Sequence, residues 1–176
     1  LRPRQWTKNL LLLAPLFFAR SAADTCLLLR AVTATIAFCF LAGGVYVLND
    51  LLDREKDRLH PEKRQRPIAA GLISTRAAVV ILAAAWALGG LWAATLGVTF
   101  GAVALGYLVL QLAYSLALKR LVILDLMLIA AGFVIRVLAG GVAVGVPVSN
   151  WLYLCTLLLA VFLGFAFKMP SVPFHT

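Results

Sequence analysis

The stretch AAVVILAAAWALGGLWAATLGVTFGAVALGYLVLQLAYSLAL, at residues 77–118, has 42 residues and no charged side chain. A helix needs about 20 apolar residues to cross the hydrocarbon core of a bilayer. The stretch is therefore too long for one span and suits two, joined by a tight turn near Gly97. It predicts a pair of membrane-spanning helices.

The rest of the chain has the same character. Of its 176 residues, 63% are hydrophobic and 13% are charged, with a mean hydropathy of +0.98, whereas soluble domains average about 45–50% apolar and 25% charged residues. We therefore expect an all-α, integral membrane helical bundle of about six transmembrane helices, forming one domain over residues 1–176. Apolar segments lie at 6–19, 27–48, 77–96, 99–118, 121–144 and 150–167. The first is short, and Pro15 is expected to kink it. Glycine pairs inside the spans are expected to allow close helix packing.

The basic residues lie at alternate ends of these segments. They precede the first segment and follow the second, fourth and sixth, whereas the opposite loops are nearly uncharged. The positive-inside rule then predicts a multi-pass protein of the inner (plasma) membrane, with its N-terminus and even-numbered span ends in the cytoplasm. This distribution also explains the net charge of +9 without a nucleic-acid partner.

Acidic residues are rare and clustered. Five of the seven lie between Asp50 and Glu62, at the predicted cytoplasmic end of the second span. Asp50, Asp53 and Asp57 are spaced so that a helix would present them on one face. Such carboxylates suit Mg²⁺, which is usually shared with substrate phosphates, and Asn49 adds an amide oxygen. The alternative is a solvated loop whose acids and bases pair at random.

A basic loop follows the acids. Lys63, Arg64 and Arg66 lie in HPEKRQRPIAAG, at residues 60–71. Cations beside a carboxylate–metal cluster would neutralise a diphosphate leaving group, so the pattern favours a transferase. Asp125 and Arg136 lie inside a predicted span, where charges pair or line a cavity. Each needs a partner on another element, and an ion or solute carrier remains an alternative function.

The run NDLLDREKDRLHPEKRQRPIAAG, at residues 49–71, resembles the first signature of the UbiA family of membrane prenyltransferases. RPRQWTKN, at residues 2–9, resembles the start of that family, and the likeness extends over about residues 2–165. Within the family, these motifs and the segment 118–156 are most similar to the branch that transfers phosphoribosyl groups to decaprenyl phosphate.

The second aspartate-rich motif of the family is not matched here. The corresponding loop, YSLALKRLVILD at residues 114–125, offers Asp125 alone. The resemblance implies that Tyr114 and Lys119 contact phosphates in its place, and it adds Lys8 and Asp125 to the substrate-binding residues. Tyr114 as an interfacial aromatic residue and Lys119 as a topology anchor are the alternatives.

The resemblance implies a Mg²⁺-dependent membrane transferase with Asp50, Asp53 and Asp57 as catalytic metal ligands. Its substrates would be 5-phosphoribosyl-1-diphosphate and a polyprenyl phosphate lipid, with release of diphosphate. Prenyl transfer from a polyprenyl diphosphate to an aromatic acceptor is the alternative reaction. The ending FAFKMPSVPFHT departs from the family, whose members continue with about three more helices. We therefore expect a partial domain, with an oligomer possible.

Overall fold

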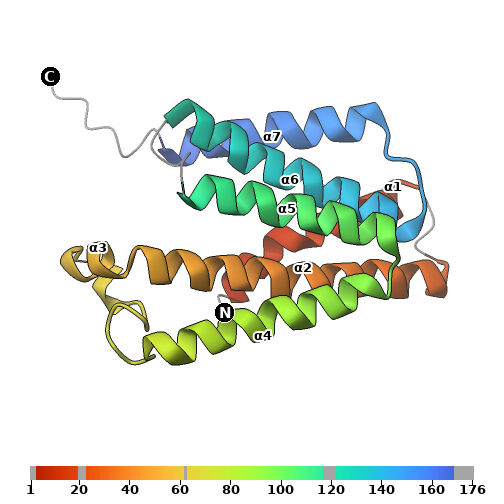
Figure 1. Cartoon of the computed structure of the whole chain (residues 1–176). Coiled ribbons are helices and arrows are strands. Elements are labelled where there is room, and N and C mark those ends of the chain that lie inside the picture. The colour runs from red at the N-terminus through yellow and green to blue at the C-terminus, as the bar shows by residue number, and fades with distance from the viewer. Residues whose placement is uncertain (1–2, 20–22, 62, 117–121, 169–176) are drawn as a thin grey trace, which may run out of the picture.

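The computed structural model describes residues 3–19, 23–61, 63–116 and 122–168. The side chains of residues 3–5, 122–125 and 166–168 lie outside the description. All regular structure in the described part is helical, which confirms the all-α prediction. In chain order the helices are η1 (Pro3–Leu13), α1 (Ala14–Phe18), α2 (Thr25–Leu52), α3 (Arg54–Leu59), η2 (Lys63–Gln65), α4 (Thr75–Ala94), α5 (Val98–Leu116), α6 (Val122–Val144) and α7 (Asn150–Lys168) (Figure 1).

The helix ends follow local chemistry. The Asp24 carboxylate accepts hydrogen bonds from two backbone N–H groups at the start of α2, and Ser74 caps α4 in the same way. These caps satisfy donors that have no partner inside the helix. Gly97 separates α4 from α5 with a φ of +102°, a left-handed conformation that favours glycine. The predicted turn at Gly97 is therefore confirmed.

Four helices in the described part are long and apolar enough to cross a membrane. They cover Thr25–Leu52, Thr75–Ala94, Val98–Leu116 and Leu126–Val144, and shorter apolar helices cover Trp6–Phe18 and Asn150–Phe165. The six predicted segments thus all form helices; the first is short, as predicted, and α7 covers the whole of the sixth.

The first segment differs from the prediction of a helix kinked at Pro15. Its first part, η1, is a 3₁₀ helix, and α1 begins at Ala14. Pro15 lies in the first turn of α1, where its missing N–H removes no helical hydrogen bond. Pro15 therefore marks the start of an α-helix and does not kink one.

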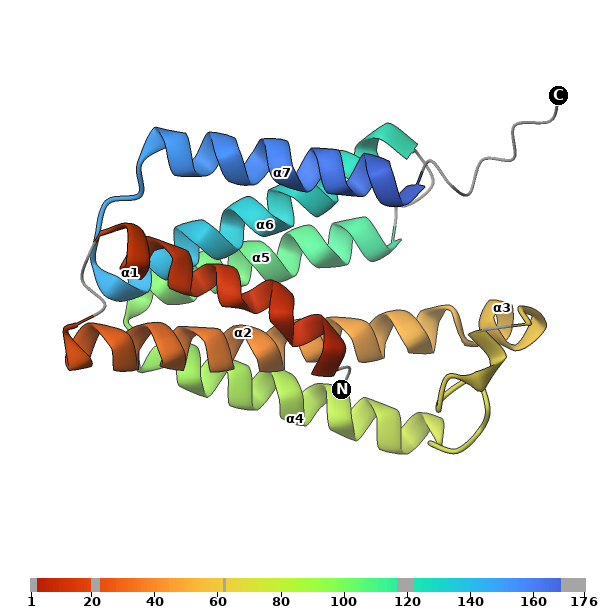
Figure 2. The same ribbon diagram turned by 180° about the vertical axis from the view of Figure 1, so that it is seen from behind.

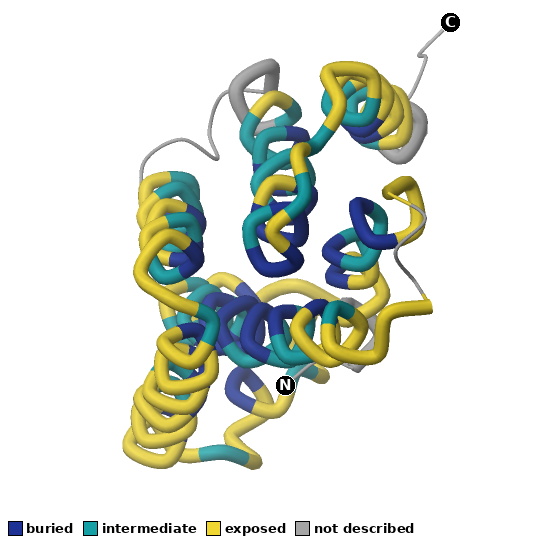
Figure 3. The backbone as a smooth tube through the Cα atoms, turned by 90° about the vertical axis from the view of Figure 1, so that its right-hand side faces the viewer, coloured by how far each residue is buried: buried dark blue, intermediate teal, exposed yellow. Residues whose placement is uncertain are grey.

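Helix α2 is the centre of the bundle. It packs against α4, α5, α6 and η1, and Figure 2 shows η1 and α1 crossing the face of α2 and α6 that lies behind in Figure 1. Phe38 of α2 contacts Phe100 and Tyr107 of α5. Buried residues concentrate where the helices meet, as Figure 3 shows. Many large apolar side chains remain exposed on the outer faces, which is expected for a protein surrounded by lipid.

Small residues allow these helices to approach closely, as predicted. A Cβ added to Gly140 of α6 would collide with the backbone of Leu12 in η1. A Cβ added to Gly89 of α4 would lie 2.8 Å from the Leu41 side chain of α2.

The acidic cluster at Asp50–Asp57 and the basic loop at Lys63–Arg66 lie at one end of the bundle. The C-terminal ends of α2 and α5 and the N-terminal end of α4 lie at this end, and α3 projects beyond it (Figure 1). This arrangement brings segments that are distant in sequence around the end of α2.

Candidate functional site

The acidic cluster lies at a break between two helices. Helix α2 ends at Leu52, and Asp53 links it to α3. The backbone N–H of Asp53 donates to the Asn49 carbonyl at 2.9 Å, and the N–H of Asp57 donates to the Asp53 carbonyl at 2.8 Å. The three aspartates therefore come from two consecutive helices with Asp53 at the junction, and not from the single helix that was predicted.

Asp50 and Asp57 nevertheless converge on one cation. Nη1 of Arg66 donates to Asp57 Oδ2 at 2.6 Å and to Asp50 Oδ1 at 3.2 Å. The exposed fractions of these side chains are 29% for Arg66, 14% for Asp50 and 5% for Asp57. Two poorly solvated carboxylates thus face the same point, which the Arg66 guanidinium occupies.

The loop that carries Arg66 is anchored to the bundle. Ile68 and Ala69 are buried, and Ile68 packs with Val47 of α2. Nε of Arg58 donates to the Ala69 carbonyl at 3.2 Å. The backbone at Arg66 is therefore held in place by the packing of the residues that follow it.

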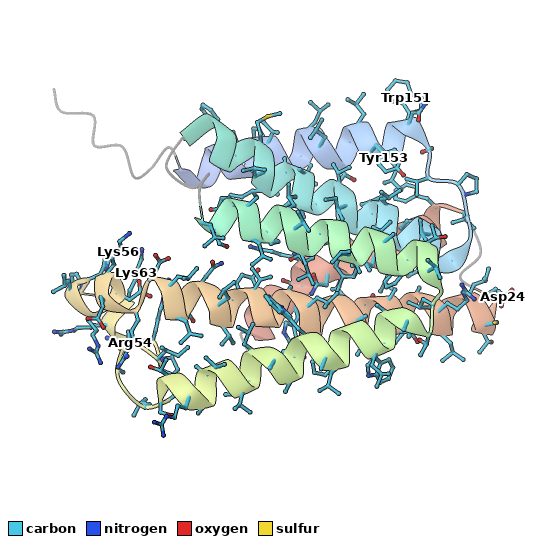
Figure 4. The ribbon with its side chains drawn as sticks, viewed as in Figure 1. Asp24, Arg54, Lys56, Lys63, Trp151 and Tyr153 are labelled. Carbon is cyan, nitrogen blue, oxygen red and sulfur yellow. The ribbon has the colours of Figure 1, made fainter. Side chains whose placement is uncertain are left out.

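Other basic side chains surround this end. Lys63 and Arg64 of η2 are exposed, and Figure 4 shows Arg54, Lys56 and Lys63 gathered around α3. Nη1 of Arg54 donates to Thr75 Oγ1 at 3.1 Å, whereas its buried Nε has no hydrogen-bond partner in the described part. Arg54 is not among the site residues that the sequence predicts, since many arginines lie in this stretch and no pattern separates it from them.

The other predicted site residues differ in how they lie relative to the acidic cluster. Asn49 and Tyr114 are half-buried, and Tyr114, near the end of α5, interacts electrostatically with Asp53. Lys8 is exposed on η1 and has Arg136 of α6 as its charged neighbour. Tyr114 therefore lies within electrostatic range of the acidic cluster, whereas the charge that acts on Lys8 is the like charge of Arg136, which repels it. Lys119 lies outside the described residues, as does the side chain of Asp125.

Arg136 is buried in the middle of the bundle. It donates from Nε to Asn9 Oδ1 at 2.8 Å, from Nη2 to the Tyr107 hydroxyl at 2.9 Å, and from Nη1 to the Gly132 carbonyl at 2.7 Å. The guanidinium also lies 4.9 Å from the centre of the Tyr107 ring, a favourable cation–π distance. The expectation that Arg136 pairs with another element is confirmed, with partners from η1 and α5.

The acidic cluster can be tested for its fit to Mg²⁺. Among the described residues, no three His, Cys, Asp or Glu side chains form a metal-ion site as they stand. However, Asp50 and Asp57 direct carboxylate oxygens at one cationic nitrogen, and Asp53 lies between them in sequence. Carboxylate oxygens are the ligands that Mg²⁺ prefers, with water and substrate phosphates completing the shell. The donor set therefore fits Mg²⁺.

Known proteins resemble this chain over nearly all of its length. It is 36% identical to the decaprenyl-phosphate phosphoribosyltransferase of Corynebacterium glutamicum, over 99% of this chain and 54% of that protein. The Mycolicibacterium smegmatis protein of the same name is 39% identical over 87% of this chain and 49% of its own length. The chain thus spans about half the length of these curated relatives.

A solved structure shares the fold. The UbiA homolog from Archaeoglobus fulgidus bound to GPP and Mg²⁺ superposes with a TM-score of 0.74 and 27% identity, covering 92% of this chain and 58% of that one. Residues 10–172 match the UbiA prenyltransferase family. The chain is therefore a multi-pass membrane protein that belongs to the UbiA prenyltransferase family.

Proposed function

We propose that this protein transfers a phosphoribosyl group from 5-phosphoribosyl-1-diphosphate to a polyprenyl phosphate, with release of diphosphate. The observation that carries the proposal is the convergence of Asp50 and Asp57 on one cation beside a basic loop. Carboxylates for a metal and cations for phosphate oxygens then lie together at the end of a membrane helix. A phosphorylated donor needs the metal and the cations, and a lipid acceptor needs a site at the membrane surface.

The relatives support the choice of substrates. Those at 36–39% identity include decaprenyl-phosphate phosphoribosyltransferases. The segment at residues 114–125 contains one acidic residue, which argues against a second aspartate-rich motif of the prenyl-transferring kind.

Each part of the site has a role in this reaction. Mg²⁺ held by Asp50, Asp53 and Asp57, with Asn49 beside them, would neutralise charge on the departing diphosphate. Lys63, Arg64 and Arg66 would bind oxygens of the diphosphate or the 5-phosphate. Tyr114, Lys119, Lys8 and Asp125 complete the proposed substrate-binding set.

The chemical step requires positioning more than proton transfer. An oxygen of the acceptor phosphate attacks the anomeric carbon, and the bond from that carbon to the diphosphate oxygen breaks. The acceptor phosphate is already ionised at neutral pH, so no general base is needed. The protein contributes by holding both phosphates in line and by stabilising the leaving group.

We propose that the protein lies in the inner membrane and that its site faces the cytoplasm. The acidic cluster and the cationic loop share one end of the bundle, while Trp151 and Tyr153 lie toward the other (Figure 4). Cytoplasmic loops are enriched in Lys and Arg, which supports this orientation.

The proposal is tested with purified protein in lipid vesicles. Incubation with ribosyl-labelled 5-phosphoribosyl-1-diphosphate, a polyprenyl phosphate and Mg²⁺ should yield a labelled lipid, and EDTA should prevent its formation. Absence of labelled lipid with Mg²⁺ present would rule out the proposed reaction.

A second candidate is prenyl transfer from a polyprenyl diphosphate to an aromatic acceptor. It is favoured by one observation, the structural likeness to a homolog bound to GPP and Mg²⁺. Release of pyrophosphate from a prenyl diphosphate in the presence of an aromatic acceptor, with the ribosyl donor left intact, would select this reaction.

A further inference from the structure

The position of Arg66 has a consequence for metal binding. Its Nη1 lies 2.6 Å from Asp57 Oδ2 and 3.2 Å from Asp50 Oδ1. Protein oxygens bind Mg²⁺ at about 2.0–2.1 Å. A metal ion shared by these two oxygens would need the space that the Arg66 nitrogen occupies. The two cations also repel each other, so they cannot share the position.

Because its loop is anchored, Arg66 can leave the carboxylates only by moving its side chain. The loop's Ile68 and Ala69 are buried, so movement of the whole loop would break hydrophobic packing. The guanidinium, by contrast, ends a long flexible side chain that is 29% exposed, and it can rotate toward solvent without moving the backbone. Its five N–H donors suit the oxygens of a diphosphate.

We propose that Arg66 is an exchangeable counter-ion of the acidic cluster. Before the donor binds, it neutralises Asp50 and Asp57. When Mg²⁺ takes these carboxylates, Arg66 moves to the diphosphate that arrives with the metal. The inference rests on the proposed function in one respect, that the cluster binds a divalent metal beside a diphosphate.

This exchange couples the two ligands. Mg²⁺ alone must displace Arg66 and leave its charge without a partner, whereas Mg²⁺ with diphosphate provides a new partner. Binding of the metal and the diphosphate is therefore expected to be mutually favourable, because coupling between two ligands is reciprocal.

The experiment measures metal and pyrophosphate binding without turnover. Mn²⁺, which gives an EPR signal, is titrated into wild-type protein and into Arg66→Gln. Removal of the competing cation should tighten Mn²⁺ binding about tenfold, within the usual range for coupled sites. The Mn²⁺-loaded variant should retain less labelled pyrophosphate, because the pyrophosphate can no longer bind the Arg66 guanidinium. General damage to the site would weaken both, so the opposite signs identify the exchange.

Arg76→Gln is the matched control. Arg76 is exposed in the first turn of α4, at the same end of the bundle, and is not part of the proposed site. This variant should bind Mn²⁺ and pyrophosphate as wild type does. In wild-type protein, Mn²⁺ should also bind more tightly when pyrophosphate is present, which tests the coupling without any mutation.

Equal or weaker Mn²⁺ binding by Arg66→Gln would overturn the inference, as would identical Mn²⁺ binding with and without pyrophosphate. These outcomes differ from failure of the proposed function. A protein that makes labelled lipid but shows no change on loss of Arg66 is a transferase without the exchange. One that shows the exchange but makes no labelled lipid has a metal–diphosphate site with other substrates.

Discussion

At the scale of single residues, Asp57 combines burial with a direct charge partner. Its side chain is 5% exposed and accepts from Arg66 at 2.6 Å. A buried carboxylate is stable only if it is paired or binds a cation. Asp57 therefore belongs both to the packing of this end of the bundle and to the proposed metal site.

Asp57→Asn is expected to lower turnover by at least about 100-fold, because it removes a charged ligand from the proposed metal site, where even outer-shell changes cost about 10–100-fold. The free energy of unfolding should fall by roughly 1–3 kcal/mol, as Arg66 keeps only Asp50 as an acidic partner. Initial rates of labelled-lipid formation and thermal unfolding in detergent measure the two effects. Glu55→Gln, whose side chain is 77% exposed on the same helix, is the control and should change neither. Wild-type turnover in Asp57→Asn would remove Asp57 from the site.

Arg136 is a second residue whose environment decides its role. It is 5% exposed and hydrogen-bonded to Asn9, Tyr107 and Gly132. In the described part its partners are all neutral, so hydrogen bonds and the Tyr107 ring replace a counter-ion. The arrangement ties η1 to α5 and α6.

Asn9→Ala is expected to destabilise the protein by about 1–3 kcal/mol, because it leaves a buried guanidinium N–H without an acceptor. A lower thermal unfolding temperature in detergent would show this. Asn150→Ala, at the exposed start of α7, is the control. Equal unfolding temperatures for the two variants would mean that the bond to Asn9 contributes nothing to stability.

At the scale of helices, close approach between η1 and α6 places the N-terminal segment. Gly140 lies against the Leu12 backbone, where an added Cβ has no space. Backbone atoms cannot rotate away as a side chain can, so a substitution would separate the two helices.

Gly140→Ala should therefore lower the free energy of unfolding by about 1–3 kcal/mol, the usual cost of overpacking. Gly106→Ala on α5 is the matched control, since an added Cβ there meets nothing within 4 Å. This control should gain about 0.5–1 kcal/mol, because alanine favours helices more than glycine. Thermal unfolding of both variants gives the comparison. A Gly140→Ala protein as stable as wild type would contradict the close packing of η1 on α6.

At the scale of the whole molecule, the proposed orientation makes Cys26 an external marker. Cys26 is exposed at the start of α2, at the opposite end of that helix from the acidic cluster. In intact cells, a membrane-impermeant maleimide should label Cys26, with Cys26→Ser as the control. In a Cys26→Ser background, Lys63→Cys should be labelled only after the cells are permeabilised. The reverse pattern would invert the topology and place the site outside.

The fold could be predicted from the sequence because its determinants are local. Lengths of apolar runs set the helices, and Gly97 sets the turn between α4 and α5. The acidic cluster was found for the same reason, since its members are close in sequence. The prediction of a single helix failed at Asp53, because no local sequence feature indicates the change from α2 to α3. It also failed at Pro15, because no feature indicates the 3₁₀ helix that precedes this residue.

The sequence by itself thus determined a helical membrane bundle with acids and bases at one end. Only the tertiary structure decided which charges meet. Arg66 reaches Asp50 across 16 residues and Asp57 across 9, and Arg136 reaches Asn9 across 127. Helical periodicity relates residues a few positions apart, whereas these contacts depend on how the loop and the helices pack. The physical reason is that a charge in a poorly solvated place takes whichever partner packing brings within reach.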